Sequence, residues 1–235
     1  PQSSSPNPPF RTSTLQMTAS SFLGFTADRT MRAAQNLYEA GLITYLRTDG
    51  INISTSPNTG EPFSEENPGP PPLQEIRNVI VEKFGDKFLS DQVRVYKSKV
   101  KNSQEAHEAI RPTNIKTYPE NINLGQDEQK LYTLIWNRTL SSQMSNSQHE
   151  RKKIEVCSKD QKYVFNASSR KTLFEGFETL SKKDSSEIIE FPENLKENEN
   201  VSLAEFISEQ KFTSPPNRYS EASLIKKMEE LGIGR

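Results

Sequence analysis

The spacing of the apolar residues changes near residue 145, and this change constrains the fold more than any other feature of the chain. Upstream of it, apolar residues three or four positions apart predict amphipathic helices. Downstream, Ile154 and Val156, then Phe165 and Ala167, alternate with polar residues as they do on strands. Because the two patterns occupy separate stretches, the sequence predicts an α+β chain with more than one domain.

Capping residues and glycines predict where the helices begin and end. Ser13 or Thr14 can cap a first helix that Gly24 ends, and Thr26 can cap a second helix that Gly41 ends. The same signals predict helices over residues 73–84, 127–144 and 220–231. Six prolines between residues 57 and 72 exclude helix and central strand there, so we expect an exposed loop.

Composition narrows the shape and the possible partners. Of the 235 residues 32% are hydrophobic and the mean hydropathy is −0.78, which favours an extended or multi-lobed shape over one large core. The net charge of −1 gives no global basic field, so any contact with nucleic acid must be local.

The single cysteine, Cys157, excludes a disulfide framework and a cysteine zinc site, and we expect it to pack in a strand. Without a long apolar run or a signal peptide, we expect a soluble, intracellular protein.

The decapeptide from Gly41 to Gly50 (GLITYLRTDG) carries the clearest chemical signal. On an extended segment Tyr45 and Arg47 share a face, so both side chains can point at one ligand. A fixed cation beside a phenol favours the phenolate and can hold a phosphate that the phenolate attacks. The alternative from these residues alone is a buried tyrosine at a strand end beside a surface arginine.

Three stretches together resemble the motifs of type IA DNA topoisomerases, in particular the bacterial topoisomerase I branch. Residues 41–49 resemble the active-site segment, residues 104–113 (QEAHEAIRPT) the second motif, and residues 215–225 (PPNRYSEASLI), running into residues 232–235, the third. Topoisomerase III typically has proline where this chain has Leu46, which favours topoisomerase I. Gly50 departs from the pattern, where serine is more usual, and we expect it to loosen the turn after the site.

The resemblance implies a role for particular residues. Tyr45 would be the nucleophile that becomes bonded to a 5′ phosphate, so that resealing needs no ATP. Arg47 would stabilise the phosphate charge, and His107 would act with Arg111 to position the DNA backbone. The predicted catalytic residues are therefore Tyr45, Arg47 and His107, and the predicted DNA-binding residues are Arg111, Thr113, Arg218, Ser220, Ser223 and Arg235.

Several of these residues have a plainer interpretation from the sequence alone. A surface histidine is the alternative for His107, and it is our prediction for His149, around which no motif stands. The helix that begins near Ser220 could present backbone N–H groups to a phosphate, but an ordinary capped helix has the same sequence pattern.

The resemblance also implies a domain arrangement within a toroidal fold. Residues 1–9 would be a linker or the end of a β-rich arch, 10–144 the mostly helical domain with the active-site tyrosine, 145–211 a segment of the arch with an acidic connection, and 212–235 the start of a helical DNA-binding domain. The family's Mg²⁺ belongs to an N-terminal Toprim domain that no stretch of this chain matches, so we expect no metal site in it. We therefore interpret the chain as a fragment that is inactive alone.

The implied partner is single-stranded or negatively supercoiled DNA, and we expect a monomer with no membrane contact. The implied location is the cytoplasm at the nucleoid, or an organelle. Three other protein classes fit parts of the pattern. A tyrosine recombinase also uses tyrosine, arginine and histidine, but its nucleophile typically follows the other two residues in the sequence. A single-stranded DNA-binding module would bind DNA without cleaving it. A pure interaction scaffold would not bind DNA.

Overall fold

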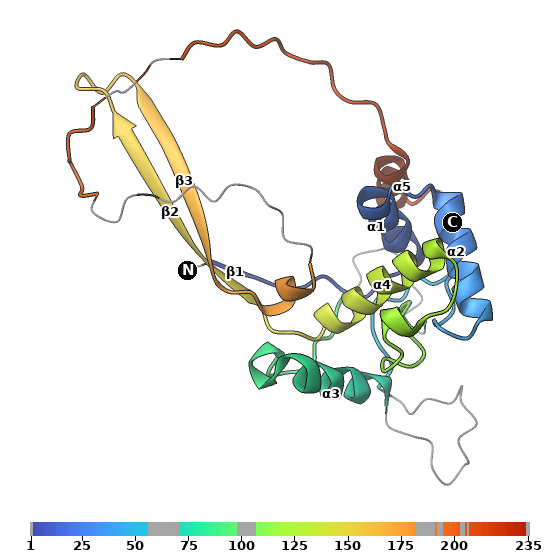
Figure 1. Cartoon of the computed structure of the whole chain (residues 1–235). Helices are drawn as coiled ribbons and strands as arrows, with labels where there is room; N and C mark the ends of the chain where they lie inside the picture. Colours follow the sequence, from blue (N-terminus) through green and yellow to red (C-terminus); the bar gives the residue numbers. More distant parts are fainter. Residues whose placement is uncertain are drawn as a thin grey trace.

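A computed structural model describes residues 2–55, 71–97, 107–181, 191, 195–202, 205 and 207–233. The chain forms a body of helices from which a long two-stranded hairpin extends to one side (Figure 1). This arrangement confirms the predicted α+β class. It also agrees with the multi-lobed shape expected from the low hydrophobic content. Most of the predicted loop between residues 57 and 72 and most of the acidic stretch after residue 181 lie outside the described residues.

The helices begin and end close to the predicted capping residues. Thr26 accepts a hydrogen bond from the backbone N–H of Arg29, and Gly24 ends the first helix with φ of 67°. The first helix starts earlier than predicted, since Thr14 lies inside it and its hydroxyl accepts a hydrogen bond from the backbone N–H of Arg11. The helices are α1 (Thr12–Leu23), α2 (Ala27–Glu39), α3 (Pro72–Phe84), α4 (Gln126–Ser141) and α5 (Glu221–Leu231), with 3₁₀ turns at Asp86–Phe88, Pro119–Asn121 and Gly176–Leu180.

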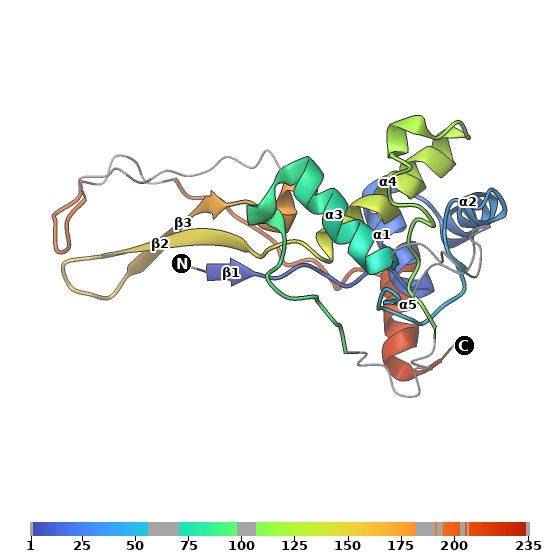
Figure 2. The same ribbon diagram turned by 90° about the horizontal axis from the view of Figure 1, so that it is seen from below.

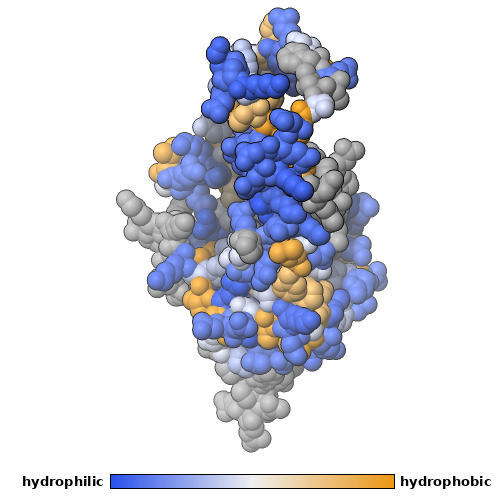
Figure 3. Space-filling model, turned by 90° about the vertical axis from the view of Figure 1, so that its left-hand side faces the viewer, coloured by the Kyte–Doolittle hydropathy of each residue, from blue (hydrophilic) through white to orange (hydrophobic). Residues whose placement is uncertain are grey.

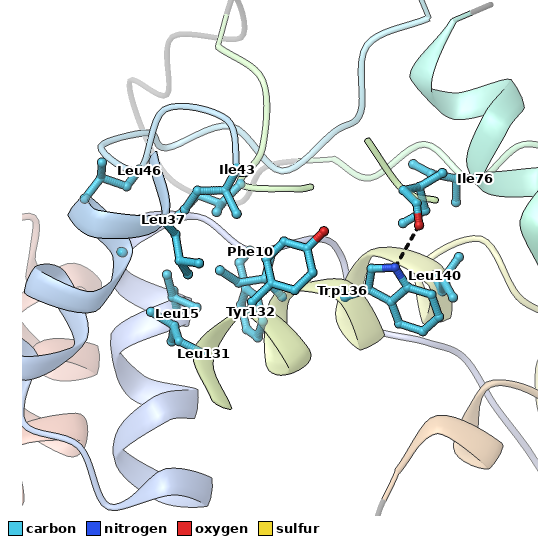
Figure 4. Close-up of a cluster of buried hydrophobic side chains, with 14 of the residues drawn as sticks. Phe10, Leu15, Leu37, Ile43, Leu46, Ile76, Leu131, Tyr132, Trp136 and Leu140 are labelled. Atoms are coloured by element: carbon cyan, nitrogen blue, oxygen red, sulfur yellow. Dashed lines mark hydrogen bonds between the residues drawn. The ribbon is translucent and has the colours of Figure 1, made fainter. Parts of the chain in front are cut away.

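One apolar core lies inside the helical body. Phe10 and Tyr132 lie at its centre, surrounded by side chains of α1, α2 and α4 (Figure 4). Trp136 of α4 is also buried, and its indole Nε1 donates a hydrogen bond to the carbonyl of Ile115 at 2.9 Å. The Tyr132 hydroxyl donates to the carbonyl of Thr117 at 2.8 Å. The polar group of each large ring therefore has a partner, which removes the cost of burying it.

An ion pair joins α2 to α4 at the edge of this core. Arg29 donates from Nε and Nη2 to the two carboxylate oxygens of Asp127, at 2.6 and 2.7 Å. The Arg29 guanidinium lowers the pKa of the Asp127 carboxyl. The pair links the first turn of α2 to the first turn of α4, and the other end of α2 leads into the Tyr45 segment.

The sheet has three antiparallel strands in the order β1 (Gln2–Ser4), β2 (Ser147–Cys157) and β3 (Val164–Phe174). The predicted strands are confirmed, and the first residues of the chain join them by pairing with the start of β2. Two predictions are wrong in this region. Cys157 lies at the end of β2 but is exposed, because the outer half of the hairpin has no core to pack against. His149 is only 2% exposed, because it lies where the hairpin meets the 3₁₀ turn at residues 176–180.

Among the described residues, no helix combines the length and the apolar character that crossing a bilayer requires.

Candidate active site

The Tyr45 segment is anchored by two buried side chains and is not a strand. Ile43 and Leu46 are each 1% exposed, and both belong to the core. On a regular strand residues three apart would face opposite sides, so the chain must bend to bury both. A single bridge between Ile43 and Pro112 is followed by bends, which corrects the predicted extended geometry. Tyr45 and Arg47 remain on the surface, on either side of the Leu46 anchor.

Thr44 ties the Tyr45 segment to the segment that follows His107. Its backbone N–H donates to the carbonyl of Arg111 at 2.9 Å, and its hydroxyl donates to the carbonyl of Ala109 at 2.8 Å. The same hydroxyl accepts a hydrogen bond from the backbone N–H of Arg111 at 3.0 Å. The Thr48 hydroxyl adds a bond to the carbonyl of Glu108 at 2.8 Å. The first two motifs therefore form one rigid unit, although about 60 residues separate them in the sequence.

The described part of the second motif is not helical, although Glu108 and Ala109 are good helix formers. Its backbone groups bond to other segments, since Ile110 donates to the carbonyl of Phe10 at 2.7 Å and Ala109 to that of Asn52 at 2.9 Å. A helix would need the same groups for its own hydrogen bonds, so tertiary contacts replace the local preference in this motif.

Gly50 allows the two motifs to approach closely. A Cβ atom at this position would overlap the carbonyl oxygen and carbon of His107. Gly50 is buried, and its backbone N–H donates to the Thr48 hydroxyl at 3.0 Å. The prediction that this glycine loosens the turn is therefore wrong, because the missing side chain makes room for the backbone that carries His107.

Replacing Gly50 with alanine should move the His107 segment. The new methyl group meets backbone atoms, which cannot rotate away, so we expect a loss of about 1–3 kcal/mol of stability. The imidazole NMR signals of His107 should shift in the same variant. Gly125→Ala is the matched control, because its Cβ would meet only the far end of the Glu128 side chain, which can rotate away. An unmoved His107 signal in Gly50→Ala would contradict the assigned role of this glycine.

A cavity of about 720 Å³ collects side chains from all three motifs. Arg47 and Asp49 line it from the first motif, and His107 from the second, with His107 Nδ1 3.5 Å from Asp49 Oδ1. The α5 helix lies beside α1 (Figure 2). Its Ile225, Met228 and Glu229 form another part of the cavity wall. The residues lining the cavity are Arg11, Thr12, Ser13, Gln16, Met31, Arg47, Thr48, Asp49, His107, Ile225, Met228, Glu229, Gly232 and Ile233.

Tyr45 is not among the residues that line this cavity. Its side chain is 54% exposed and contacts the ring of Tyr38 edge to face, with 5.4 Å between the ring centroids. The structure thus brings two of the three predicted catalytic residues, Arg47 and His107, to one cavity and leaves Tyr45 accessible from solvent. The catalytic roles of all three stay predictions.

Arg111 occupies a different position from the one expected. It is 5% exposed and its guanidinium donates to both carboxylate oxygens of Glu108, at 2.8 and 3.1 Å. It also donates to the carbonyl of Pro112 at 2.8 Å. These bonds hold the guanidinium inside the chain, and the DNA-binding role of Arg111 stays a prediction. Thr113 likewise uses its hydroxyl internally, as a donor to the carbonyl of Gly41 at 2.6 Å.

The third motif forms an ordinary capped helix start. The Ser220 hydroxyl accepts from the backbone N–H of Ser223 at 3.2 Å, and the Ser223 hydroxyl donates to the carbonyl of Ser220 at 3.0 Å. Arg218 is exposed just before this cap. DNA contacts by these three residues stay predictions, and Arg235 lies outside the described residues.

The contact that fastens α5 over the cavity was not predicted. Glu229 accepts from Arg11 Nη2 at 2.7 Å and from the Ser13 hydroxyl at 2.9 Å. Both charged side chains are mostly buried, with exposures of 16% for Arg11 and 22% for Glu229. No local signal could have revealed this contact, because 218 residues separate the two charges in the sequence.

Replacing Glu229 with glutamine should loosen α5 from α1. Hydrogen bonds to a charged group contribute about 1.5–3 kcal/mol, so amide exchange of α5 should accelerate about ten-fold or more. Hydrogen exchange read by mass spectrometry measures this for the peptide over residues 221–231. Glu230→Gln is the control, since Glu230 is half exposed and pairs with Lys227 on the same helix. Equal exchange in the two variants would show that the Arg11 contact does not hold the helix.

The described residues contain no group of three or more histidine, cysteine, aspartate or glutamate side chains arranged to hold a metal ion.

Comparisons with known proteins agree with the motifs. A family model described as DNA topoisomerase matches residues 1–235. The DNA topoisomerase 1 of Rickettsia bellii is 44% identical over all of this chain and 29% of its own length, and that of Helicobacter pylori strain 26695 is 44% identical over 97% of the chain and 30% of its own. The structure of full-length topoisomerase I from Thermotoga maritima aligns with a TM-score of 0.74 and 35% identity, covering 100% of this chain and 36% of that one. The chain thus spans about 30% of the length of the curated relatives.

Proposed function

Because this chain belongs to the DNA topoisomerase family, and resembles its bacterial topoisomerase I members, we propose that it carries the tyrosine that cleaves one DNA strand in a type IA topoisomerase. The observation that carries the proposal is the meeting of three distant motifs at one cavity. Arg47, His107 and the α5 helix that follows Arg218 all contribute to its walls. In the whole enzyme this arrangement would serve relaxation of negative supercoils without ATP.

The chemistry assigned to the site is a reversible transesterification. The Tyr45 oxygen attacks the phosphorus, its proton passes to a base, and the bond from phosphorus to the 3′ oxygen breaks. The 3′ oxygen takes up a proton and leaves as a hydroxyl, while the 5′ phosphate stays bonded to Tyr45. Since one phosphoester replaces another, the reverse step reseals the strand without an external energy source.

Charge stabilisation is the role that the cavity supports best. Arg47 contributes a permanent cation two residues from Tyr45, and His107 contributes a ring that can donate a hydrogen bond to a phosphate oxygen. Donors that are already in place before the reaction stabilise developing charge without having to reorganise. In this proposal Mg²⁺ belongs to a Toprim domain, while Arg47 and His107 act on the phosphate through charge and hydrogen bonding.

The proposal includes a domain assignment and a location. Residues 10–144 form the tyrosine-bearing domain, 145–211 part of a β-rich arch that also takes residues 1–9, and 212–235 the start of the DNA-binding domain. The substrate is single-stranded or negatively supercoiled DNA, and the protein acts as a monomer in the cytoplasm, at the nucleoid.

The polarity of a covalent adduct tests the proposal. Single-stranded DNA labelled at either end is incubated with the chain, with and without an added Toprim domain and Mg²⁺, and then denatured. We expect a covalent species that keeps the 3′ label and forms only with the added domain. A species that keeps the 5′ label would indicate recombinase-type chemistry. Co-purification of the two pieces shows that they assemble, and an assembled pair that forms no adduct would overturn the proposal.

A DNA-binding module without cleavage is the second candidate. The position of Tyr45 outside the cavity lining favours it, because Arg47 and His107 could then hold a phosphate that no nucleophile attacks. This candidate predicts salt-dependent binding of single-stranded DNA with no adduct under any condition.

A further inference from the structure

A second polar cavity lies on the hairpin, away from the Tyr45 segment. Its volume is about 270 Å³, and its walls include Ser4, His149, Arg151, Ser168 and Arg170. The strand register pairs His149 with Gln2, and Arg151 with Arg170, so these side chains share one face of the sheet. The hairpin extends away from α1, α2 and α5 in Figure 1, and the surface on its side of the molecule is mostly hydrophilic in Figure 3.

The charges at this cavity are not balanced by its own walls. Arg151 and Arg170 stand directly opposite each other on neighbouring strands, a position in which like charges repel. Within the described part of the chain Arg151 makes no ion pair, and no acidic residue lines the cavity. Arg170 is partly neutralised by Glu178 Oε1 at 3.3 Å. An anion between the two guanidinium groups would relieve the repulsion.

His149 adds a buried imidazole ring to the same cavity. Its Nε2 lies 2.6 Å from Arg170 Nη2, which can only donate, and 3.1 Å from Glu178 Oε1, which can only accept. The Nδ1 atom is buried and has no hydrogen-bond partner in the described structure. Ser147 and Glu178 approach the Nε2 side of the ring, at 3.0 and 3.1 Å, and so do not satisfy it. A buried ring nitrogen without a partner is unfavourable, so His149 keeps an unmet hydrogen bond beside the two arginines.

We propose that this cavity binds a phosphate group between Arg151 and Arg170. Two arginines and the serine hydroxyls match the charge and the oxygens of a phosphate, and planar guanidinium groups hold such oxygens in pairs. This step rests on the proposed function: in the whole enzyme the phosphate group belongs to a DNA backbone that the sheet holds at a distance from the cleavage site. A free phosphate ion shares the same chemistry.

Imidazole NMR of the full 235-residue chain tests the proposal, because the chain has only two histidines. The His149 signals, assigned by comparison with His149→Gln, are followed during titration with inorganic phosphate at constant ionic strength. We expect a saturable shift in the unmodified chain that is at least about ten-fold weaker in affinity in Arg151→Glu. The Arg151→Glu change should also raise the urea midpoint, since it replaces a like-charge pair with an ion pair. Lys159→Glu, with the same charge change in the exposed hairpin turn, is the control.

A second titration distinguishes the sources. Short oligothymidylate should produce the same His149 shift, and the same oligomer with neutral methylphosphonate linkages should not. No saturable phosphate shift, or a shift unchanged by Arg151→Glu, would overturn the site. A shift with inorganic phosphate but none with oligothymidylate would overturn the DNA backbone as its ligand. The proposed function fails separately, when the assembled enzyme forms no Tyr45 adduct.

Discussion

Replacing Tyr45 with phenylalanine should abolish the covalent protein–DNA adduct and leave the fold intact. The substitution removes only the nucleophilic oxygen, and loss of a nucleophile typically lowers turnover by more than about 1,000-fold. The Tyr45 hydroxyl makes no hydrogen bond within the described structure, and the ring contact with Tyr38 survives in phenylalanine. Adduct formation with the added Toprim domain, and a urea melt of the chain, measure the two effects.

Tyr38→Phe is the matched control for this prediction. Tyr38 is also exposed, lies against the Tyr45 ring and has no hydrogen bond from its hydroxyl within the described structure. We expect normal adduct yield in Tyr38→Phe and unchanged affinity for single-stranded DNA in both variants. Adduct that persists in Tyr45→Phe would disprove the assignment of the nucleophile, and adduct lost only in Tyr38→Phe would transfer the role to Tyr38.

Replacing Phe10 with alanine should destabilise the fold more than Gly50→Ala or Glu229→Gln does. Phe10 is fully buried at the centre of the core (Figure 4). Its ring centroid lies 4.3 Å from the Arg138 guanidinium, and its backbone carbonyl accepts a hydrogen bond from the backbone N–H of Ile110. Removing a buried phenylalanine ring leaves a cavity and costs about 3–5 kcal/mol. Urea denaturation followed by circular dichroism measures the change.

Phe22→Ala makes the same chemical change at an exposed position. Phe22 lies on α1 and is 74% exposed, so its loss should change the free energy of unfolding by less than about 0.5 kcal/mol. Similar losses in the two variants would contradict the burial of Phe10. Alanine keeps the backbone carbonyl that accepts from Ile110, so any change in the His107 signals would report a backbone shift around the cavity that the ring leaves.

The sequence could predict features that depend on near neighbours. Thr26 and Gly24 bound their helices because a cap bonds to groups a few residues away, and the period-two pattern of the hairpin is read directly from its strands. Each of the three motifs is a continuous stretch of sequence, so they could be recognised without a structure, and they identified the family correctly.

The sequence could not predict features that depend on distant contacts. The bend at Tyr45 follows from burying both Ile43 and Leu46 in a core built by other helices. Arg111 was predicted to be a DNA-binding residue, yet Glu108 and neighbouring carbonyls hold its guanidinium inside the chain. His149 was expected on the surface, and its burial depends on residues that lie about thirty positions further along the chain.

The amino-acid sequence by itself determined the α+β class, the helix caps and the identity of the motifs, since each depends on residues a few positions apart. Only the tertiary structure decided which side chains share a cavity, because that depends on contacts such as Thr44 with Ala109 and Arg11 with Glu229. These contacts form when the core packs, and their partners are separated by 65 and 218 residues. Gly50 shows the difference most clearly. From the sequence a glycine indicates a flexible turn, whereas in the fold its missing side chain leaves space for the backbone of His107.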